Sequence, residues 1–314
     1  MKKENGHIQI VMSKNKPIDR TEWQHLYPFT SHFINRNGFK YHYLDQGSGE
    51  PIVMIHGNPT WSFFFRELVK GLSNRYRTIA PDHIGCGLSE KPGIDRYDFR
   101  LQSRVDDLDQ FIATLSLKKK LTLVLHDWGG MIGLAVALRR PEMIGRIVIL
   151  NTAAFLPPRG KGLPLRLQII RKVDFMAKPA VLGGNLFVQG ALMMAPHRRL
   201  DPAVRAGLSA PYNCWNNRLA TLMFVRDIPL SATDPSYAMV KHVDENIHRF
   251  KNLPILICWG EHDFVFDRDY LSEWRRRFPG AEVHSFPNAG HYLLEDAPRP
   301  ILNLVDRFLQ RHPL

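Results

Sequence analysis

Short apolar runs alternate with helical patterns along most of the chain. The apolar runs are rich in β-branched residues and end at polar or glycine-containing turns, which is typical of buried strands. They lie at 33–36, 40–44, 52–55, 77–80, 121–125, 146–150, 255–259 and 281–286. Helical spacing of apolar residues follows at 61–72, 101–117, 129–138, 270–278 and 301–311. This alternation of strand and helix predicts an α/β fold.

The alternation stops between residues 155 and 234. This stretch holds prolines, methionines and aromatic residues in three helix-like segments, at 165–176, 186–194 and 215–224. A run of about 80 helical residues between two strand–helix regions indicates a cap inserted into a core domain. We therefore expect an N-terminal extension (1–26), a core made of 27–154 and 235–314, and a helical cap (155–234).

The composition is that of a globular protein with an excess of positive charge. The chain has 314 residues, of which 44% are hydrophobic, and 42 basic residues against 30 acidic ones give a net charge of +12. The basic residues form short clusters without interleaved aromatic residues, so nucleic-acid binding is not expected. A solvated basic surface is the simplest interpretation, and attraction to an acidic partner protein or to anionic lipid is the alternative.

Several classes of protein are not expected. The first 16 residues lack the apolar core of a signal peptide, and no run approaches the roughly 18 apolar residues of a membrane span. Three widely spaced cysteines give neither a disulfide framework nor a zinc site, which favours the reducing cytoplasm. There is no HExxH motif and no phosphate-binding loop, so we expect no metal and no cofactor.

The strongest chemical signal is the segment 125–130, Leu-His-Asp-Trp-Gly-Gly, between a predicted buried strand and a predicted helix. A side chain on such a sharp turn is held above the sheet, in front of a helix N-terminus. Its occupant here is Asp127, and a carboxylate can attack an electrophilic carbon without first losing a proton. Taken alone, Asp127 could equally be an ordinary helix N-cap.

Three further motifs favour catalysis. The segment 56–59, His-Gly-Asn-Pro, follows a central strand from which one oxyanion-hole amide is expected, while Trp128 supplies the other. Asp263 ends a polar loop after a late strand, and His291 follows the last strand. The order nucleophile, acid, histidine predicts a triad of Asp127, Asp263 and His291.

These motifs resemble the haloalkane dehalogenases over nearly the whole chain from about Tyr27. The matching segments are HGNPTWS (56–62), PDHIGCGLS (81–89), HDWGG (126–130), WGEHD (259–263) and NAGH (288–291). The resemblance implies an α/β-hydrolase fold, with a mostly parallel eight-stranded sheet, helices on both faces and an inserted helical cap. One dehalogenase subgroup takes its acid after the sixth strand, but residues 150–152 contain no carboxylate, so the acid should be Asp263.

A closer resemblance is to the third dehalogenase subfamily, which includes the β-lactone decarboxylases of bacterial long-chain olefin synthesis. It is carried by the segments 82–92, 150–155, 210–219, 226–231 and 308–314. Asp127 would then attack either a haloalkane or a β-lactone. In both cases Asn58 and Trp128 would hold the departing anion.

Two other functions stay open at this point. An epoxide hydrolase would need two cap phenols, for which Tyr212 and Tyr237 are available, although epoxide hydrolases usually carry an aromatic residue in place of Asn58. A non-catalytic receptor or scaffold of the same fold would normally have lost a triad member.

The cap is expected to select the substrate, because its apolar side chains could line a slot for a small apolar substrate such as a long-chain β-lactone or a haloalkane. The alternative is that they form the core of the cap itself. Such a substrate and a basic surface would suit a multi-enzyme assembly or peripheral membrane association. The candidates are Phe155, Leu156, Leu165, Phe175, Met176, Leu182, Leu186, Phe187, Met193, Met194, Leu222, Met223 and Phe224.

Overall fold

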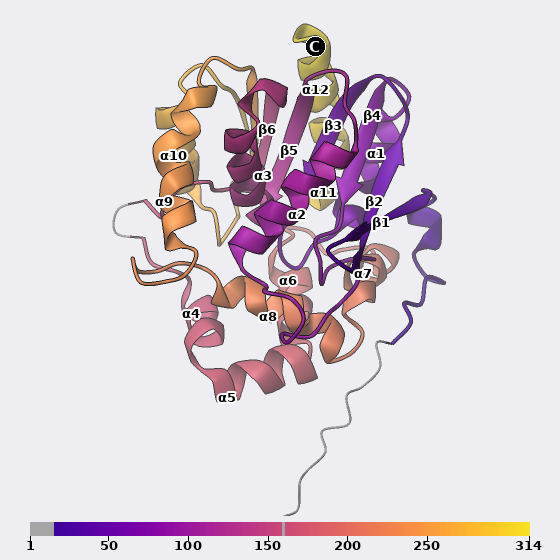
Figure 1. Cartoon of the computed structure of the whole chain (residues 1–314), viewed down its shortest axis with the longest axis vertical. Helices are drawn as coiled ribbons and strands as arrows, with labels where there is room; N and C mark the ends of the chain where they lie inside the picture. Colours follow the sequence, from indigo (N-terminus) through magenta and orange to yellow (C-terminus); the bar gives the residue numbers. More distant parts are fainter. Residues whose placement is uncertain (1–15, 159–160) are drawn as a thin grey trace, which may run out of the picture.

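A computed structural model describes residues 16–158 and 161–314 (Figure 1). Its centre is one eight-stranded sheet with the strand order β1-β2-β4-β3-β5-β6-β7-β8. β2 runs antiparallel to β1 and β4, and all other neighbouring pairs are parallel. Every predicted strand is present and the predicted fold class is confirmed. The strands are β1 (Ser31–Arg36), β2 (Phe39–Gln46), β3 (Glu50–Ile55), β4 (Tyr76–Pro81), β5 (Leu121–Asp127), β6 (Ile144–Thr152), β7 (Ile255–Gly260) and β8 (Glu282–Phe286).

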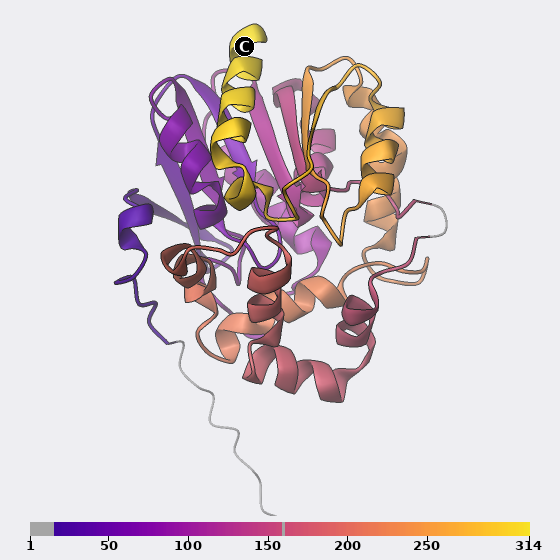
Figure 2. The same cartoon turned by 180° about the vertical axis from the view of Figure 1, so that it is seen from behind.

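Helices cover both faces of this sheet (Figures 1 and 2). One face carries α2 (Leu101–Thr114), α3 (Trp128–Arg139), α9 (Tyr237–Asn246) and α10 (Arg268–Arg277). The other carries α1 (Arg66–Leu72), α11 (Leu293–Asp296) and α12 (Pro298–Arg311). The predicted helix at 61–72 is a 3-10 turn, η2 (Ser62–Phe65), that leads into α1. Neither α9 nor α11 was predicted. The other short turns are η1 (Gln24–Leu26), η3 (Pro141–Met143), η5 (Ala210–Tyr212), η6 (Asn216–Arg218) and η7 (Ile247–Phe250).

The central strands are apolar without interruption because both of their faces are buried. Along β3, Val53 and Ile55 pack towards α2 and α3, whereas Ile52 and Met54 pack towards α1 and α12. Successive side chains of a strand point to opposite faces, so a sheet covered on both sides needs apolar residues at every position. This explains why these strands read as continuous apolar runs.

The segment 155–234, called the cap from here on, lies across the carboxyl ends of the strands (Figures 1 and 2). Its elements are α4 (Leu165–Lys172), α5 (Asp174–Ala177), the π-helical turn η4 (Lys178–Gly183), α6 (Leu186–Met194), α7 (Pro202–Ser209) and α8 (Leu219–Arg226). The predicted helix at 165–176 is interrupted at Val173, whose backbone is not helical. Among the described residues, no helix of the cap or the core is both long and apolar enough to cross a membrane.

The helix α7 was missed, although its start carries an ordinary signal. Asp201 accepts a hydrogen bond from the backbone N–H of Ala203, and Pro202 occupies the first helical position. An acidic N-cap followed by proline is a common helix start. This signal is only two residues long, so α7 was not separated from the loops of the cap in the sequence.

Candidate active site

Asp127 stands on a sharp turn between β5 and α3. Its backbone has φ 51° and ψ −126°, in a region that non-glycine residues rarely adopt. Two neighbouring glycines make room for this turn: a Cβ atom on Gly57 would lie 2.0 Å from Oδ1 of Asp127, and one on Gly129 would lie 2.0 Å from the carbonyl oxygen of Ile55. The turn therefore places the carboxylate above the carboxyl ends of the strands.

A backbone amide holds one oxygen of this carboxylate. The N–H of Asn58 donates to Oδ1 of Asp127 at 2.6 Å. The backbone N–H of Trp128 is near enough to act against the rise in the pKa of Asp127. These are the two amides predicted for an oxyanion hole. If Asp127 formed an ester through Oδ2 and water added to it, the amide of Asn58 would face the negative charge that develops on Oδ1. Oδ2 is left for attack.

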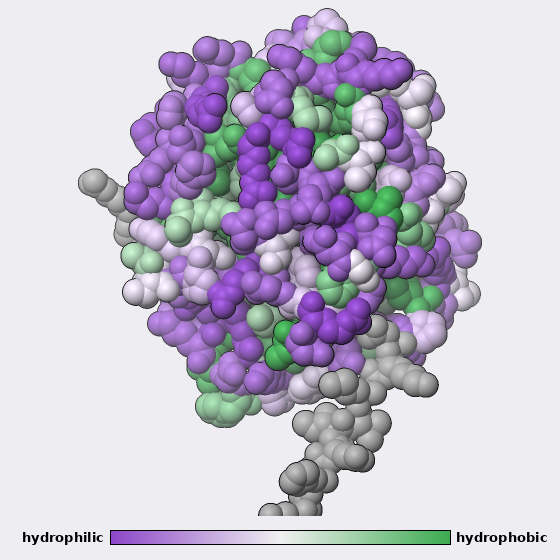
Figure 3. Space-filling model, in the orientation of Figure 1, coloured by the Kyte–Doolittle hydropathy of each residue, from purple (hydrophilic) through white to green (hydrophobic). Residues whose placement is uncertain are grey.

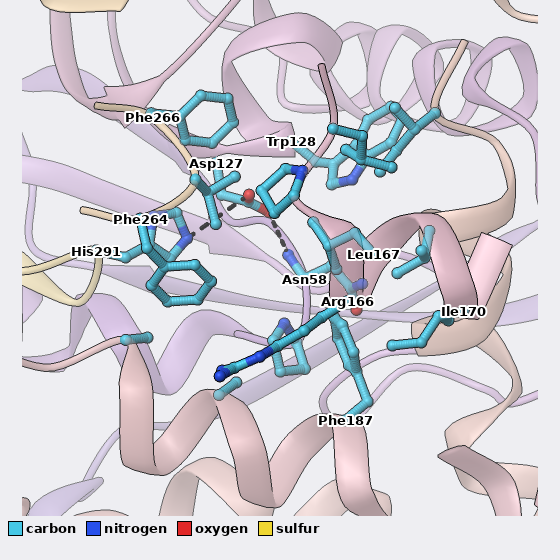
Figure 4. Close-up of a pocket in the computed structure, with 18 of the residues that line it drawn as sticks. Asn58, Asp127, Trp128, Arg166, Leu167, Ile170, Phe187, Phe264, Phe266 and His291 are labelled. Carbon is cyan, nitrogen blue, oxygen red and sulfur yellow. Dashed lines mark hydrogen bonds and ion pairs between the residues drawn. The ribbon is translucent and has the colours of Figure 1, made fainter. Parts of the chain in front are cut away.

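His291 lies between the carboxylates of Asp127 and Asp263. Figure 4 shows its contact with Asp127. Its Nδ1 is 2.7 Å from Oδ2 of Asp263, and its Nε2 is 3.6 Å from Oδ2 of Asp127. Oδ1 of Asp263 accepts the backbone N–H groups of Val265 at 2.7 Å and Phe266 at 3.0 Å. Asp263 thus fixes the ring so that Nε2 faces the carboxylate of Asp127, which is the arrangement of a base oriented by an acid.

Asn151 is a residue of the site that sequence reasoning missed. Its Nδ2 donates to Oδ2 of Asp263 at 2.9 Å, and its Oδ1 accepts the backbone N–H of Gly260 at 2.7 Å. It belongs to the segment 150–152, where one dehalogenase subgroup carries its acid. The sequence could have pointed to Asn151, because an amide stands there in place of a carboxylate. In the structure this amide holds the acid that another loop supplies.

His126 was also missed. It is fully buried, its Nε2–H donates to the carbonyl oxygen of His291 at 2.9 Å, and its ring lies 4.7 Å from that of His291. Burial holds the pKa of His126 well below its ordinary value, so the ring is neutral at physiological pH. It positions the backbone of His291 without adding charge to the site.

Burial and charge act in opposite directions on the reacting groups. Burial raises the pKa of Asp127, and the positive potential of His291 and the two amides offsets this only in part. Burial alone would lower the pKa of His291, but the carboxylates of Asp263 and Asp127 outweigh it and raise that pKa. Asp127 is therefore a poorly solvated carboxylate beside a histidine that holds its proton more tightly than usual.

Two side-chain donors face the same space as the carboxylate. Nδ2 of Asn58 donates one hydrogen bond to the carbonyl oxygen of Thr221 at 3.0 Å, which leaves its second hydrogen available. Within the described part of the chain, the indole N–H of Trp128 meets no acceptor. Its ring packs 5.4 Å from Phe224, over which the buried guanidinium of Arg104 stacks at 3.5 Å. The site thus offers two neutral donors for an anion.

These groups open into a cavity of about 790 Å³ between the core and the cap. This volume lies within the roughly 300–1,000 Å³ that is common for small-molecule sites. Asn58, Asp127, Trp128 and His291 lie at one end, and α4 and α6 supply much of the rest of the wall (Figure 4). Five of the thirteen predicted cap residues line it: Phe155, Leu165, Leu186, Phe187 and Met194.

The other predicted cap residues lie elsewhere. Leu182 and Leu222 form a small core of the cap, while Leu156, Met223 and Phe224 pack onto the main core. Phe175, Met176 and Met193 are exposed. The two phenols considered for epoxide opening do not reach the cavity either. Tyr237 is not part of its wall, and the buried hydroxyl of Tyr212 donates to the carbonyl oxygen of Thr60 at 3.3 Å.

Residues 50–298 match the family described as the alpha/beta hydrolase fold. The chain belongs to the α/β hydrolase family. Within the described residues, no group of three or more His, Cys, Asp or Glu side chains could hold a metal ion.

Among α/β hydrolases, the chain is 47% identical over 285 residues to a protein of Shewanella oneidensis named cis-3-alkyl-4-alkyloxetan-2-one decarboxylase, which covers 90% of this chain and 89% of the relative. A protein of the same name from Xanthomonas campestris pv. campestris is 42% identical, with 92% and 98% covered. Haloalkane dehalogenase 2 of Mycobacterium bovis is 32% identical, with 93% and 99% covered.

A solved structure has the same fold. The haloalkane dehalogenase of Agrobacterium tumefaciens C58 superimposes with a TM-score of 0.81 at 24% identity, over 90% of this chain and 97% of that one. At this identity the likeness shows the fold alone. The predicted resemblance to the dehalogenases and their decarboxylase relatives is confirmed by the relatives that are 32 to 47% identical.

Proposed function

We propose that this enzyme is a β-lactone decarboxylase that converts cis-3-alkyl-4-alkyloxetan-2-ones into cis-alkenes and carbon dioxide. The observation that carries the proposal is the higher identity to two proteins with that name, 47% and 42%, than to the named dehalogenases at 32%. The large and mostly apolar cavity next to Asp127 supports it, because the substrate carries two alkyl chains.

In the first step, Oδ2 of Asp127 attacks the ring carbon that bears the C–O single bond. That bond breaks as the new ester bond forms, and both of its electrons stay on the oxygen. The ring opens to a free carboxylate, while the carbon chain remains attached to the enzyme through Asp127. The amide of Asn58 keeps Oδ1 in place and so orients Oδ2 for attack.

In the second step, the bond between the new carboxylate and its carbon breaks and carbon dioxide leaves. Its electrons form the double bond, and the ester bond to Asp127 breaks with its electrons returning to Oδ2. Attack inverts the ring carbon, and loss of the two groups from opposite sides then gives the cis alkene from the cis lactone. No water is consumed and Asp127 is regenerated.

The side chains of Asn58 and Trp128 would bind the carboxylate formed in the first step. Both donors are neutral, so they stabilise an anion without the strong hold of a full positive charge. That suits a group that must be released as carbon dioxide. His291 is not required as a base in this scheme, because no proton has to be moved.

Haloalkane hydrolysis is the second candidate, and the complete arrangement of His291 and Asp263 favours it. A histidine ordered by a buried carboxylate, with Nε2 directed at the nucleophile, can activate water to cleave an alkyl ester of Asp127. Asn58 and Trp128 would then hold halide.

The decisive experiment offers the enzyme a cis-dialkyl β-lactone and a series of 1-bromoalkanes and measures alkene and bromide separately. We expect alkene from the lactone with little bromide release, and no ¹⁸O incorporation into Asp127 when the lactone is turned over in H₂¹⁸O. Rapid bromide release with an inert lactone would establish the second candidate instead.

His291→Ala separates the two chemistries on one enzyme. Alkene formation should persist, whereas hydrolysis of an alkyl ester on Asp127 should fall by the roughly 10²–10⁴-fold that a general base contributes. Equal loss of both activities would contradict the scheme without water.

We further propose that residues 155–234 act as the substrate-selecting cap on a core made of 27–154 and 235–314. The free thiols of Cys86, Cys214 and Cys258 fit the reducing cytoplasm. The apolar substrate and the net positive charge also favour work beside a membrane or in a multi-enzyme assembly.

A further inference from the structure

Exposed apolar side chains gather on one part of the cap. Of the twelve large hydrophobic residues that are exposed in the described part of the chain, nine belong to the cap and seven to α4, α5 and α6. The most exposed are Phe175 at 80% and Leu165 and Met193 at 71% each. We call these seven the apolar collar: Leu165, Ile169, Phe175, Met176, Leu186, Met193 and Met194.

The collar does not serve the packing of the cap. The small core beneath these helices is made by Ala177, Val181, Leu182 and Leu222, all of them buried. Hydrophobic residues at the lower edge of the molecule, over α5, face outward next to hydrophilic ones (Figure 3). Clustered apolar side chains on a surface, rimmed by polar residues, usually mark an interaction site.

Part of the collar lies at the entrance of the active-site cavity. Leu165, Leu186 and Met194 are exposed to solvent and at the same time line the cavity, so they lie at its mouth. Arg166 does the same, and its guanidinium contacts the sulfur of Met194 across the gap between α4 and α6. Apolar side chains therefore continue from the cavity onto the outer surface of the cap, with the guanidinium of Arg166 beside them at the mouth.

The charge around the collar is positive. Between residues 165 and 194 the chain has four basic residues and a single acidic one, Asp174. That carboxylate already pairs with Lys178 at 3.3 Å and with Arg226. Arg166 and Lys172 are exposed beside the collar. Over 161–234 the sequence has ten basic and four acidic residues, so half of the net charge of the protein lies on less than a quarter of its length.

We propose that the collar docks the enzyme onto a lipid bilayer that contains anionic headgroups, with the mouth of the cavity turned towards the lipid. Apolar side chains on short helices insert at the boundary between headgroups and acyl chains, and nearby lysine and arginine residues are attracted by the negative surface. Because Arg166 and Lys172 are exposed beside the collar while Asp174 is already paired, a negatively charged lipid surface fits this face.

The docking deepens the proposed function, since it gives the alkene a route out of the cavity. A long-chain alkene is far more soluble in a bilayer than in water. Release through a mouth seated in lipid would spare the product any passage through water. The route of the alkene rests on the proposed function, whereas the docking rests only on the surface of the cap.

The test is sedimentation of the full-length protein with vesicles of phosphatidylcholine alone and with 30% phosphatidylglycerol. The wild type should sediment with the anionic vesicles, less with neutral ones, and less again at high salt because charge attraction is screened. Phe175→Glu/Met193→Glu should lower the partition coefficient at least tenfold, and Lys172→Glu/Lys178→Glu should remove the preference for anionic lipid.

Phe33→Glu is the matched control for an added charge, because Phe33 is also exposed but lies on β1, outside the cap. It should bind vesicles like the wild type. Neither Phe175 nor Met193 lines the cavity, so the double variant should unfold at the same temperature and turn over a short, water-soluble lactone at the same rate.

Each failure has a distinct meaning. The docking is overturned if the wild-type protein does not bind anionic vesicles, or if the double variant binds them like the wild type. A collar-dependent dimer in light scattering without vesicle binding overturns it as well and assigns the collar to a second copy of the chain. Vesicle binding together with an inert lactone supports the docking and overturns only the proposed reaction.

Discussion

The side-chain amide of Asn151 donates a 2.9 Å hydrogen bond to the same oxygen of Asp263 that lies 2.7 Å from His291. Asn151 lies at the carboxyl end of β6, whereas Asp263 follows β7 and is 112 positions away. The acid that orients the histidine is thus itself oriented from the neighbouring strand. A second hydrogen bond, from the backbone N–H of Gly260 to Asn151, keeps the amide from turning over.

Asn151→Ala should weaken the step that depends on His291 more than the step that does not. We expect hydrolysis of the enzyme ester formed from a 1-bromoalkane to slow by about 10- to 100-fold, part of the 10²–10⁴-fold effect of a general base. Alkene formation from the lactone should change by less than about threefold. Single-turnover kinetics that separate ester formation from its hydrolysis provide the measurement.

A merely structural role for Asn151 would lower both activities together, in proportion to the folded fraction. Asn151→Asp is the informative partner variant, because it puts a second carboxylate against Asp263. Repulsion between the two should raise the pKa of the pair and move the acid limb of hydrolysis.

Asp127→Asn should abolish lactone turnover and bromide release, each by more than about 10⁴-fold, as expected for loss of a nucleophile. The substitution should not lower the stability of the folded protein. Burial raises the pKa of Asp127, so the folded state disfavours its charged form, and above that pKa the charge costs stability. Asparagine also tolerates the positive φ of this position.

Removing the charge at residue 127 should therefore leave the melting temperature unchanged or raise it at pH 7. Calorimetry of both proteins measures this. The gain should shrink as the pH falls through the folded-state pKa of Asp127, because the wild-type carboxyl is then neutral as well. A clear loss of stability in the variant at pH 7 would contradict the raised pKa.

The two reactions should differ in their dependence on pH. Lactone cleavage needs only an ionised Asp127, whose pKa lies above the ordinary 3.8. Ester hydrolysis also needs a neutral His291, whose pKa lies above the ordinary 6.5. As the pH falls from 8 to 6, bromoalkane hydrolysis should decline while lactone turnover is better retained. Steady-state rates across this range test the ordering, and a common acid limb for both substrates would refute it.

Gly57→Ala should disable the nucleophile by contact alone. The new Cβ would lie 2.0 Å from Oδ1 of Asp127 and 2.4 Å from its Cβ, far inside van der Waals distance. The carboxylate must shift, and misplacement of a reacting group by about 1 Å can cost 10²-fold in rate. We expect at least that loss of alkene formation.

Gly280→Ala is the control, because a Cβ there meets nothing within 4 Å and its backbone does not need glycine. It should leave the rate and the melting temperature unchanged. An active Gly57→Ala enzyme would mean that the amide of Asn58 does not fix the carboxylate of Asp127.

Many strands and turns of the core could be predicted from short stretches of sequence. The β3 strand is a continuous apolar run because each of its side chains is buried on one face or the other, and Asn37-Gly38 forms the expected turn with both residues at positive φ. The turn at Asp127 was recognisable for the same reason, since its strand, its glycines and its helix are all local. The helices α7 and α9 were missed because their signals are short or lie next to the cap.

Where each apolar residue of the cap packs could not be predicted from the sequence. Periodicity marks a helix face as apolar, but Leu182, Leu186 and Met193 look alike in sequence. The structure places Leu182 in the core of the cap, Leu186 at the cavity and Met193 in solvent. Which neighbour an apolar face meets depends on how the helices are packed, and local patterns carry no information about this.

The sequence by itself determined the type of fold, the turn that carries Asp127 and the order of the candidate residues. These depend on the spacing of side chains along one strand or helix and on the backbone freedom of a few glycines. Only the tertiary structure decided that Asn151 and His126 position the acid and the base, and that the cavity opens through an apolar collar. The contacts of Asn151 and His126 join residues more than 100 positions apart, and their distances are set by the packing of whole strands and helices against one another.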